Sequence, residues 1–487
     1  MPGMNASERK RRGAYYTPDA VVRSLVRWAT RSPRDRMLDP ACGDGRFLMA
    51  HPNSVGVEQD PAASAVVHVR VPGCLIEGGD FFSWAANTQE RFDCAAGNPP
   101  FIRYQRFTGP VRRAAMELCG RHGVHLSGLS SSWAPFLVAT ATLLKPGGRM
   151  AFVVPAEIGH APYARPVLEY LAQHFGGVRV VAIRDRLFPG LSEDCWLLFA
   201  EGFGGRTDHF WLSALERFVF LSTPPEGGTR VGLREWRLWN HKLRPFFLSP
   251  QVRDLYQHAA ERRDSYRLGE VARVGIGYVT GANSFFHLRP SEAERLNIPP
   301  GLLNVSVRKG TYLKGRAVTA STVDGWRKRD EPVLLLRLSG DMDLPAPVQS
   351  YLDSPAGRAA RTSYKCRTRT PWYAVPDVTV PDGFLSYMSG SGPSLVANHA
   401  ACVATNSVHV VKLRDSACMK TLIASWDTPL VRLSCEVEGH PLGGGLLKLE
   451  PREAARVLLP RALSMPEQDV ELIEAAVTAM RRWRHHG

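Results

Sequence analysis

Between residues 13 and 200, short apolar runs alternate with segments whose apolar side chains recur at helical spacing, and this alternation limits the folds open to the chain. The expected strands are Arg36–Asp39, Ser54–Glu58, Cys74–Glu77, Phe92–Ala96, Arg149–Val154, Val178–Ile183 and Trp196–Ala200. Helical patterns cover Pro18–Thr30 and Ser131–Leu144. Such alternation predicts an α/β fold, a Rossmann-like, doubly wound and mostly parallel sheet with helices on both faces.

The first two expected strands end in residues suited to a nucleoside ligand. Asp39 ends the first, and the turn behind it contains Ala41, Gly43 and Gly45. The two glycines let the backbone turn sharply and approach a ligand without a Cβ clash. Glu58 ends the second strand, nineteen residues after Asp39, where a carboxylate can accept both ribose hydroxyls of an adenosine.

The third expected strand leads into GGDFF, residues 78–82. Asp80 can accept a hydrogen bond from an adenine amino group, and Phe81 can lie against the adenine ring. Each carboxylate taken alone is more often a surface group. Because the carboxyl ends of parallel strands meet at one edge of a sheet, the three acidic residues together predict a cofactor that contains adenosine.

The fourth expected strand is followed by GNPPF, residues 97–101. Proline cannot occupy a central strand, so Asn98, Pro99 and Pro100 are predicted to form a rigid loop at the rim of the sheet. An Asn-Pro turn without a function is the simpler interpretation. Its position after three acidic strand ends favours a catalytic loop.

Length and composition bound the rest of the chain. A chain of 487 residues exceeds one compact core, and we expect a catalytic domain at 1–225 and a mixed α+β domain at 226–487. Its nine cysteines include no CxxC pair, so we expect a reducing compartment and no metal site. Neither a signal peptide nor an apolar run of 18 residues is present, so we expect a cytoplasmic protein that does not contact a membrane.

The formal net charge is +15, and ten of those excess charges fall in residues 226–487. This surplus favours a polyanionic partner, although a basic surface can also serve solubility alone. Two basic stretches contain no acidic residue, and their cations are Arg308, Lys309, Lys314 and Arg316 in the first and Arg361, Lys365, Arg367 and Arg369 in the second. All of these cations except Arg361 are named as candidates for DNA contact. We expect Arg367 and Arg369 to share one side of an extended segment.

The order of these motifs resembles a known family. GAYYTPDAVVRSLV, LDPACGDGRFL, VGVEQDP, GDFF and NPPF occur in the order of class gamma N6-adenine-specific DNA methyltransferases, the modification enzymes of Type II restriction–modification systems. The likeness covers residues 12–200 closely. Four later segments resemble the target-recognition domains of these enzymes more weakly: GYVTGANSFF, CRTRTPWY, ANHAACVATNSVHVV and GGGLLKLEP.

The resemblance implies transfer of a methyl group from S-adenosylmethionine to the N6 amine of an adenine flipped out of double-stranded DNA. The Asn98 side-chain oxygen and the Pro99 carbonyl are the expected acceptors for the two amine hydrogens. Phe101 would stack on the target base, and Phe188, in RLFPG, would contact its other side. Thr17, in YYTP, would touch the methionine part of the cofactor, and it also has the spacing of a helix N-cap.

Several alternatives remain open. Ribosomal-RNA and protein-glutamine methyltransferases carry similar NPP loops, because a glutamine amide needs the same two acceptors as a base amine. A DNA-binding relative with an inactive pocket is a further alternative. We expect a monomer and a cognate restriction endonuclease that acts separately, since no fused nuclease motif is evident.

Overall fold

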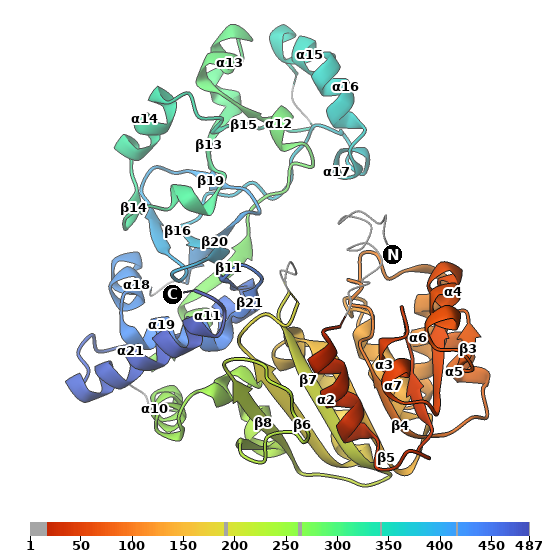
Figure 1. The fold of residues 1–487 in the computed structure, drawn as a ribbon. Helices are drawn as coiled ribbons and strands as arrows, with labels where there is room; N and C mark the ends of the chain where they lie inside the picture. Colours follow the sequence, from red (N-terminus) through yellow and green to blue (C-terminus); the bar gives the residue numbers. More distant parts are fainter. Residues whose placement is uncertain (1–16, 189–192, 262–264, 341–342, 415–416, 487) are drawn as a thin grey trace. The chain divides into compact units, whose positions relative to one another are not determined.

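The computed structural model describes residues 17–486 except 189–192, 262–264, 341–342 and 415–416 (Figure 1). Tyr15 and Tyr16 of the YYTP motif, and Pro189 and Gly190 of RLFPG, therefore lie outside the described residues. The chain divides into two compact units, Met1–Leu248 and Ser249–Gly487. The first unit runs past the expected boundary at 225 because a strand at Thr229–Gly232 pairs with its sheet.

The first unit contains one sheet of nine strands in the order β3-β2-β1-β4-β5-β7-β6-β8-β9. Its strands are β1 (Met37–Asp39), β2 (Ser54–Glu58), β3 (Leu75–Gly78), β4 (Phe92–Gly97), β5 (Leu144–Pro155), β6 (Phe175–Ile183), β7 (Cys195–Phe203), β8 (His209–Leu215) and β9 (Thr229–Gly232). Strands β1 to β5 pair in parallel, and β7 runs antiparallel between β5 and β6. The predicted doubly wound, mostly parallel sheet is confirmed.

Helices cover both faces of this sheet. As a result, every residue of Met150–Pro155 in the central strand β5 is buried, whichever face its side chain points to. The helices of the first unit are α2 (Asp19–Ala29), α3 (Arg46–Ala50), α4 (Pro61–Arg70), α5 (Phe81–Asn87), α6 (Gly109–Arg121), α7 (Trp133–Ala141), α8 (Ala164–His174), α9 (Leu233–Leu238) and the 3-10 helices η1 (Ala156–Gly159) and η2 (Arg244–Phe247). The apolar stripe of α2 packs on alternate residues of the sheet, including Cys94, Ala96, Ala151 and Val153.

The second unit is a mixed α+β domain, as predicted, with small sheets of two to five strands. Its strands are β10 (Ser265–Arg267), β11 (Ala272–Ile276), β12 (His287–Leu288), β13 (Leu303–Val307), β14 (Ala317–Val318), β15 (Leu334–Leu336), β16 (Gly383–Ser386), β17 (Met388–Ser389), β18 (Leu395–Asn398), β19 (Val403–Ala404), β20 (Val408–Leu413), β21 (His440–Leu442), β22 (Leu446–Lys448) and β23 (Leu458–Pro460). The largest has the order β11-β20-β16-β18-β14.

Helices lie around these sheets, and most of them are shorter than three turns (Figure 1). They are α10 (Pro250–Glu261), α11 (Leu268–Val271), α12 (Asn283–Phe286), α13 (Pro290–Arg295), α14 (Ala320–Lys328), α15 (Ala346–Leu352), α16 (Pro355–Arg361), α17 (Tyr364–Arg367), α18 (Met419–Trp426), α19 (Pro429–Glu438), α20 (Pro451–Ala454), α21 (Glu467–Arg482), η3 (Pro300–Leu302) and η4 (Gly310–Tyr312). Among the described residues, no helix combines the length and apolar character needed to cross a membrane.

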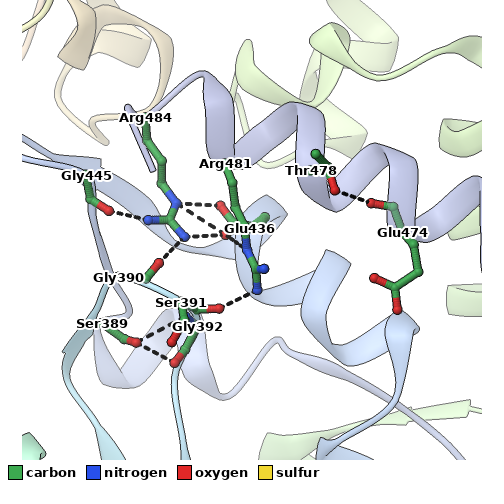
Figure 2. A network of polar contacts seen from close by, with 10 residues as sticks. All are labelled: Ser389, Gly390, Ser391, Gly392, Glu436, Gly445, Glu474, Thr478, Arg481 and Arg484. Carbon is green, nitrogen blue, oxygen red and sulfur yellow. Dashed lines mark hydrogen bonds and ion pairs between the residues drawn. The ribbon is translucent and has the colours of Figure 1, made fainter. Parts of the chain in front are cut away.

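A buried ion pair joins the last helical segment to the rest of the second unit (Figure 2). The Arg484 side chain is fully buried, and its Nη2 and Nε donate to the two Glu436 carboxylate oxygens at 2.7 and 3.0 Å. The same guanidinium donates to the carbonyls of Gly390 and Gly445. Residues from α19 and from two loops are thereby held by one cation.

Candidate active site

The strand order places the predicted cofactor residues along one edge of the sheet. Strand β1 pairs in parallel with β2 on one side and with β4 on the other, so the chain reverses its direction of winding between β1 and β4. Ligands of open α/β sheets bind outside the carboxyl ends of the strands at such a switch point. Asp39 and Asn98 flank this point, and Glu58 and Asp80 follow at the ends of β2 and β3.

Glu58 holds the turn behind β1. Its Oε2 accepts from the Gly43 amide at 2.9 Å, and its Oε1 accepts from the Asp60 amide at 2.8 Å. Gly43 and Gly45 have φ angles of +54° and +81°, which glycine adopts without strain. Burial raises the pKa of the Glu58 carboxyl above its ordinary value. The carboxylate keeps further lone pairs at the edge of the sheet, where ribose hydroxyls could donate.

Asp39 is 1% exposed, and only its Oδ1 has a hydrogen bond, accepted from the Ala41 amide at 3.2 Å. Its Oδ2 has no hydrogen-bond partner among the described residues. Burial raises the pKa of this carboxyl to about 8. A Cβ on Gly97 would stand 2.8 Å from Asp39 Oδ1, so the close approach of β4 requires glycine. An orphaned carboxylate oxygen fits a ligand with donor or cationic groups, as S-adenosylmethionine has.

Asp80 and Phe81 have structural partners of their own. Asp80 caps α5, because its Oδ2 accepts from the Ser83 amide at 2.9 Å and from Ser83 Oγ at 2.7 Å. Phe81 is 3% exposed and stacks on Phe136 with ring centroids 5.1 Å apart. One face of the Phe81 ring is therefore already covered, and its contact with an adenine ring stays a prediction.

The structure brings Asn98 and Thr17 together. Asn98 Nδ2 donates to Thr17 Oγ1 over 3.1 Å, and the buried Asn98 Oδ1 has no partner among the described residues. Helix α2 begins at Asp19 with Pro18 as its N-cap residue, so the predicted N-cap role of Thr17 is wrong. Its hydroxyl, in a side chain only 4% exposed, orients the Asn98 amide instead.

Ser132 anchors the NPPF loop, and the sequence did not single it out. Its Oγ donates to the Pro100 carbonyl and accepts from the Ile102 amide at 2.8 Å, while its own amide donates to the Ile102 carbonyl at 3.0 Å. Ser132 precedes α7 as the N-cap residue, yet its side chain makes no capping bond because the loop occupies it. A serine run before a helix was the only available signal.

The two predicted base-stacking aromatics belong to one apolar cluster. Phe188 is 5% exposed within the core that α2 covers, and the half-buried Phe101 packs against that same core. Phe188 has the burial of a core residue, so its contact with a base remains a prediction.

Cys42, in the glycine turn, is buried, and burial raises the pKa of its thiol. A thiol that stays protonated is not a nucleophile.

The seven predicted DNA contacts of the second unit separate into held and exposed side chains. Arg308 donates to the Pro332 carbonyl at 3.0 Å, and Arg316 pairs with Asp427 at 2.6 Å. Arg369 Nη1 donates to the Thr280 carbonyl at 2.7 Å. Arg316 is nevertheless exposed, as are the other four cations, Lys309, Lys314, Lys365 and Arg367. The predicted extended segment at 367–369 is wrong, because Arg367 ends the short helix α17.

The first unit has the fold of an S-adenosylmethionine-dependent methyltransferase. Residues 240–485 match the family described as Type II methyltransferase M.Eco57I, C-terminal domain, and residues 3–68 match N-6 DNA Methylase. The chain therefore belongs to the Type II methyltransferases.

Curated relatives agree with this membership. Type II methyltransferase M.XamI of Xanthomonas campestris pv. amaranthicola is 24% identical over 479 residues, which cover 92% of this chain and 85% of that protein. Type II methyltransferase M.TthHB8I of Thermus thermophilus is 34% identical over 200 residues, 37% of this chain and 45% of that protein.

Two solved structures share the fold. The Type IIL restriction-modification enzyme MmeI in complex with DNA has a TM-score of 0.58 at 13% identity, over 93% of this chain and 69% of its own. The DrdV–DNA complex has a TM-score of 0.53 at 11% identity, over 96% of this chain and 57% of its own. Both solved chains are longer than this one, and at these identities they bear on the fold alone.

Proposed function

We propose that the chain is a class gamma, site-specific DNA methyltransferase that methylates the N6 amine of an adenine flipped out of the duplex. The observation that carries this proposal is the Asn98 side chain. Its Nδ2 is engaged by Thr17, and its buried Oδ1 lacks a partner among the described residues. A buried acceptor without a donor is costly, so its presence at a strand end favours a ligand that donates there.

The chemistry follows from the amine. The lone pair of an adenine amino group is delocalised into the ring, which makes the nitrogen a poor nucleophile. Acceptors at both hydrogens favour a pyramidal nitrogen with a localised lone pair. Asn98 Oδ1 is the first acceptor and the Pro99 carbonyl the second, while Phe101 and Phe188 would hold the ring.

The cofactor would occupy the edge from β3 to β4. Glu58 would accept from the ribose, Asp80 from the adenine amino group, and Thr17 and Asp39 would face the methionine part. S-adenosylmethionine supplies a methyl group activated by the positive sulfonium. The loop from Asn98 to Phe101 would then position the target nitrogen.

A direct test measures labelled methyl transfer to unmethylated DNA, followed by modification-sensitive sequencing of DNA from cells that express the chain. N6-methyladenine at one recurring sequence is the expected product. Asn98→Ala should abolish it while cofactor binding persists. Methylation of ribosomal RNA or of protein glutamine, with none on DNA, would favour the alternative substrates.

The biological role we propose is protection of host DNA in a restriction–modification system in the cytoplasm. A cognate endonuclease would act as a separate protein. A monomer suffices, since a hemimethylated site needs modification of one strand at a time. Light scattering of the enzyme with and without DNA checks the oligomeric state.

A further inference from the structure

The helix pair α16–α17 of the second unit carries an exposed basic surface with one exposed aromatic residue. Residues 354–376 include five basic side chains and no acidic one. Arg361, Lys365 and Arg367 are exposed, and none of them has an acidic partner among the described residues. Tyr364 is 68% exposed, with the Lys365 ammonium 6.0 Å from its ring centroid. We call these four residues the α16–α17 patch.

The backbone beneath this patch is locked in place by Arg369. Its Nη1 donates to the Thr280 carbonyl at 2.7 Å, and its Nη2 donates to the Val279 carbonyl. Cys366 Sγ, fully buried, also donates to the Thr280 carbonyl at 3.6 Å. Gly281 lies so close that a Cβ would stand 2.7 Å from the Lys365 Cβ. The segment 279–281 is therefore the support on which α17 rests.

Aromatic packing completes this support. Trp372 contacts Phe285 and Phe286 of α12, with ring centroids 5.7 and 6.3 Å apart. Phe285 also stacks on Tyr351 of α15 at 4.6 Å. Helices α15, α16 and α17 lie together in the second unit (Figure 1). The patch thus stands on a packed layer, and its exposed side chains are free to contact a partner.

We propose that the α16–α17 patch is a DNA-contact surface in which Arg361, Lys365 and Arg367 bind phosphates and the Tyr364 ring packs on the nucleic acid. Arg369 is a positioning residue that supports the patch and does not itself touch DNA. The proposal rests on the proposed function for the identity of the polyanion. Unpaired cations are complementary to phosphates, and an exposed aromatic ring among them offers a stacking surface.

A contrast with other exposed cations of the second unit supports this assignment. Arg316 and Arg329 are also exposed, at 72% and 61%, but each is paired with an acidic side chain, Asp427 and Glu331. A cation already neutralised by a carboxylate releases fewer counterions when it meets a phosphate. Exposed cations without an acidic partner, as in the α16–α17 patch, are therefore better suited to bind phosphates.

The test measures binding of the full-length protein to a mixed-sequence DNA duplex across a salt series by fluorescence anisotropy. Arg361→Gln, Lys365→Gln and Arg367→Gln should each lower the salt slope by about one unit and weaken binding about tenfold near 0.1 M salt. Tyr364→Ala should weaken binding about tenfold, and Tyr364→Phe should not. Arg329→Gln is the matched control and should match the wild type.

Arg369→Gln separates support from contact. It should lower the melting temperature and weaken DNA binding, whereas the Arg367→Gln protein should melt as the wild type does. Wild-type affinity and salt slope in all four patch variants would overturn the proposal, even if the wild type methylates DNA and the proposed function stands. Absence of DNA methylation by the wild type would instead overturn the proposed function.

Discussion

Asn98 Nδ2 donates to Thr17 Oγ1 across 81 positions of sequence, with 3.1 Å between the two atoms. The bond ties the loop after β4 to the residue that precedes α2. Because the amide nitrogen is engaged, the amide oxygen is left for another donor. The orientation of the proposed catalytic amide therefore depends on a hydroxyl outside the NPPF motif.

Replacing that hydroxyl should slow catalysis. Thr17→Val keeps the shape of the side chain but removes the acceptor for Asn98 Nδ2, so the amide loses its fixed orientation. We expect kcat to fall about tenfold, equivalent to one net hydrogen bond. Thr17→Ser retains the hydroxyl and should stay near the wild-type rate. An equal loss in both variants, measured by labelled methyl transfer, would assign the effect to packing.

Ser132 should act on the same loop from the other side. Ser132→Ala removes the donor to the Pro100 carbonyl and the acceptor for the Ile102 amide, leaving buried groups unpaired at a cost of about 1–3 kcal/mol each. We expect lower kcat with unchanged cofactor affinity. Ser130→Ala alters a neighbouring buried serine and is the control; comparable kinetics of the two variants would contradict the anchoring role.

Glu58 should govern cofactor affinity. Glu58→Ala removes the proposed ribose acceptor and releases the Gly43 and Asp60 amides, so S-adenosylmethionine binding should weaken by about 1.5–3 kcal/mol. Glu58→Gln keeps one acceptor oxygen and should lose less. Calorimetry measures both, and unchanged affinity in the alanine variant would remove Glu58 from the site.

Asp39 should make stability depend on pH. Burial raises the pKa of its carboxyl from an ordinary 3.8 to about 8, so between about pH 4 and 8 the folded state holds a proton that the unfolded state has lost. The free energy of unfolding contributed by this group is highest below pH 4 and falls as pH rises to about 8. Asp39→Asn should flatten that dependence in the cofactor-free protein. Denaturant unfolding at a series of pH values measures this dependence. If the Asp39 carboxyl is ionised in the folded state, the wild type and Asp39→Asn will show the same change of unfolding free energy with pH.

The Arg484–Glu436 pair should dominate the stability of the second unit (Figure 2). Arg484→Met leaves the Glu436 carboxylate, which is 2% exposed, with the Arg481 guanidinium at 3.6 Å as its one remaining ion-pair partner among the described residues. We expect a loss of about 3–5 kcal/mol, the usual effect of removing one partner of a buried pair. Arg432→Met, which breaks the more exposed pair with Glu474, should cost less than about 1 kcal/mol. Equal melting shifts in the two variants would contradict this ranking.

The sheet and its strand ends could be predicted because they depend on local patterns. Parallel strands bring their carboxyl ends to one edge, so Asp39, Glu58 and Asp80 could be grouped without any tertiary contact being known. The role of Ser132 could not be predicted from the sequence, because its hydroxyl donates to the Pro100 carbonyl 32 positions away. Any other buried donor could bind that carbonyl equally well. Phe81 follows the expected spacing, but spacing does not tell which face of its ring the core covers.

The orientations of Arg367 and Arg369 also could not be predicted from their spacing alone. Two cations separated by one residue share a side only on extended backbone, and the short helix α17 turns them apart. One guanidinium binds main-chain carbonyls and the other lies exposed. Charge patterns give the number of candidate contacts, whereas backbone conformation decides which of them are available.

Arg369 supports the α16–α17 patch, whereas other residues form its exposed surface. This separation affects how the sequence of such an enzyme can diverge. Because this guanidinium donates to the main-chain carbonyls of Val279 and Thr280, these two bonds do not depend on which side chains stand at those positions. The patch residues above it carry little of the packing, so substitutions there need no compensating change in the core. Affinity for DNA could drift, or be redesigned, at positions 361, 364, 365 and 367 while the scaffold and the methyl-transfer chemistry remain constant.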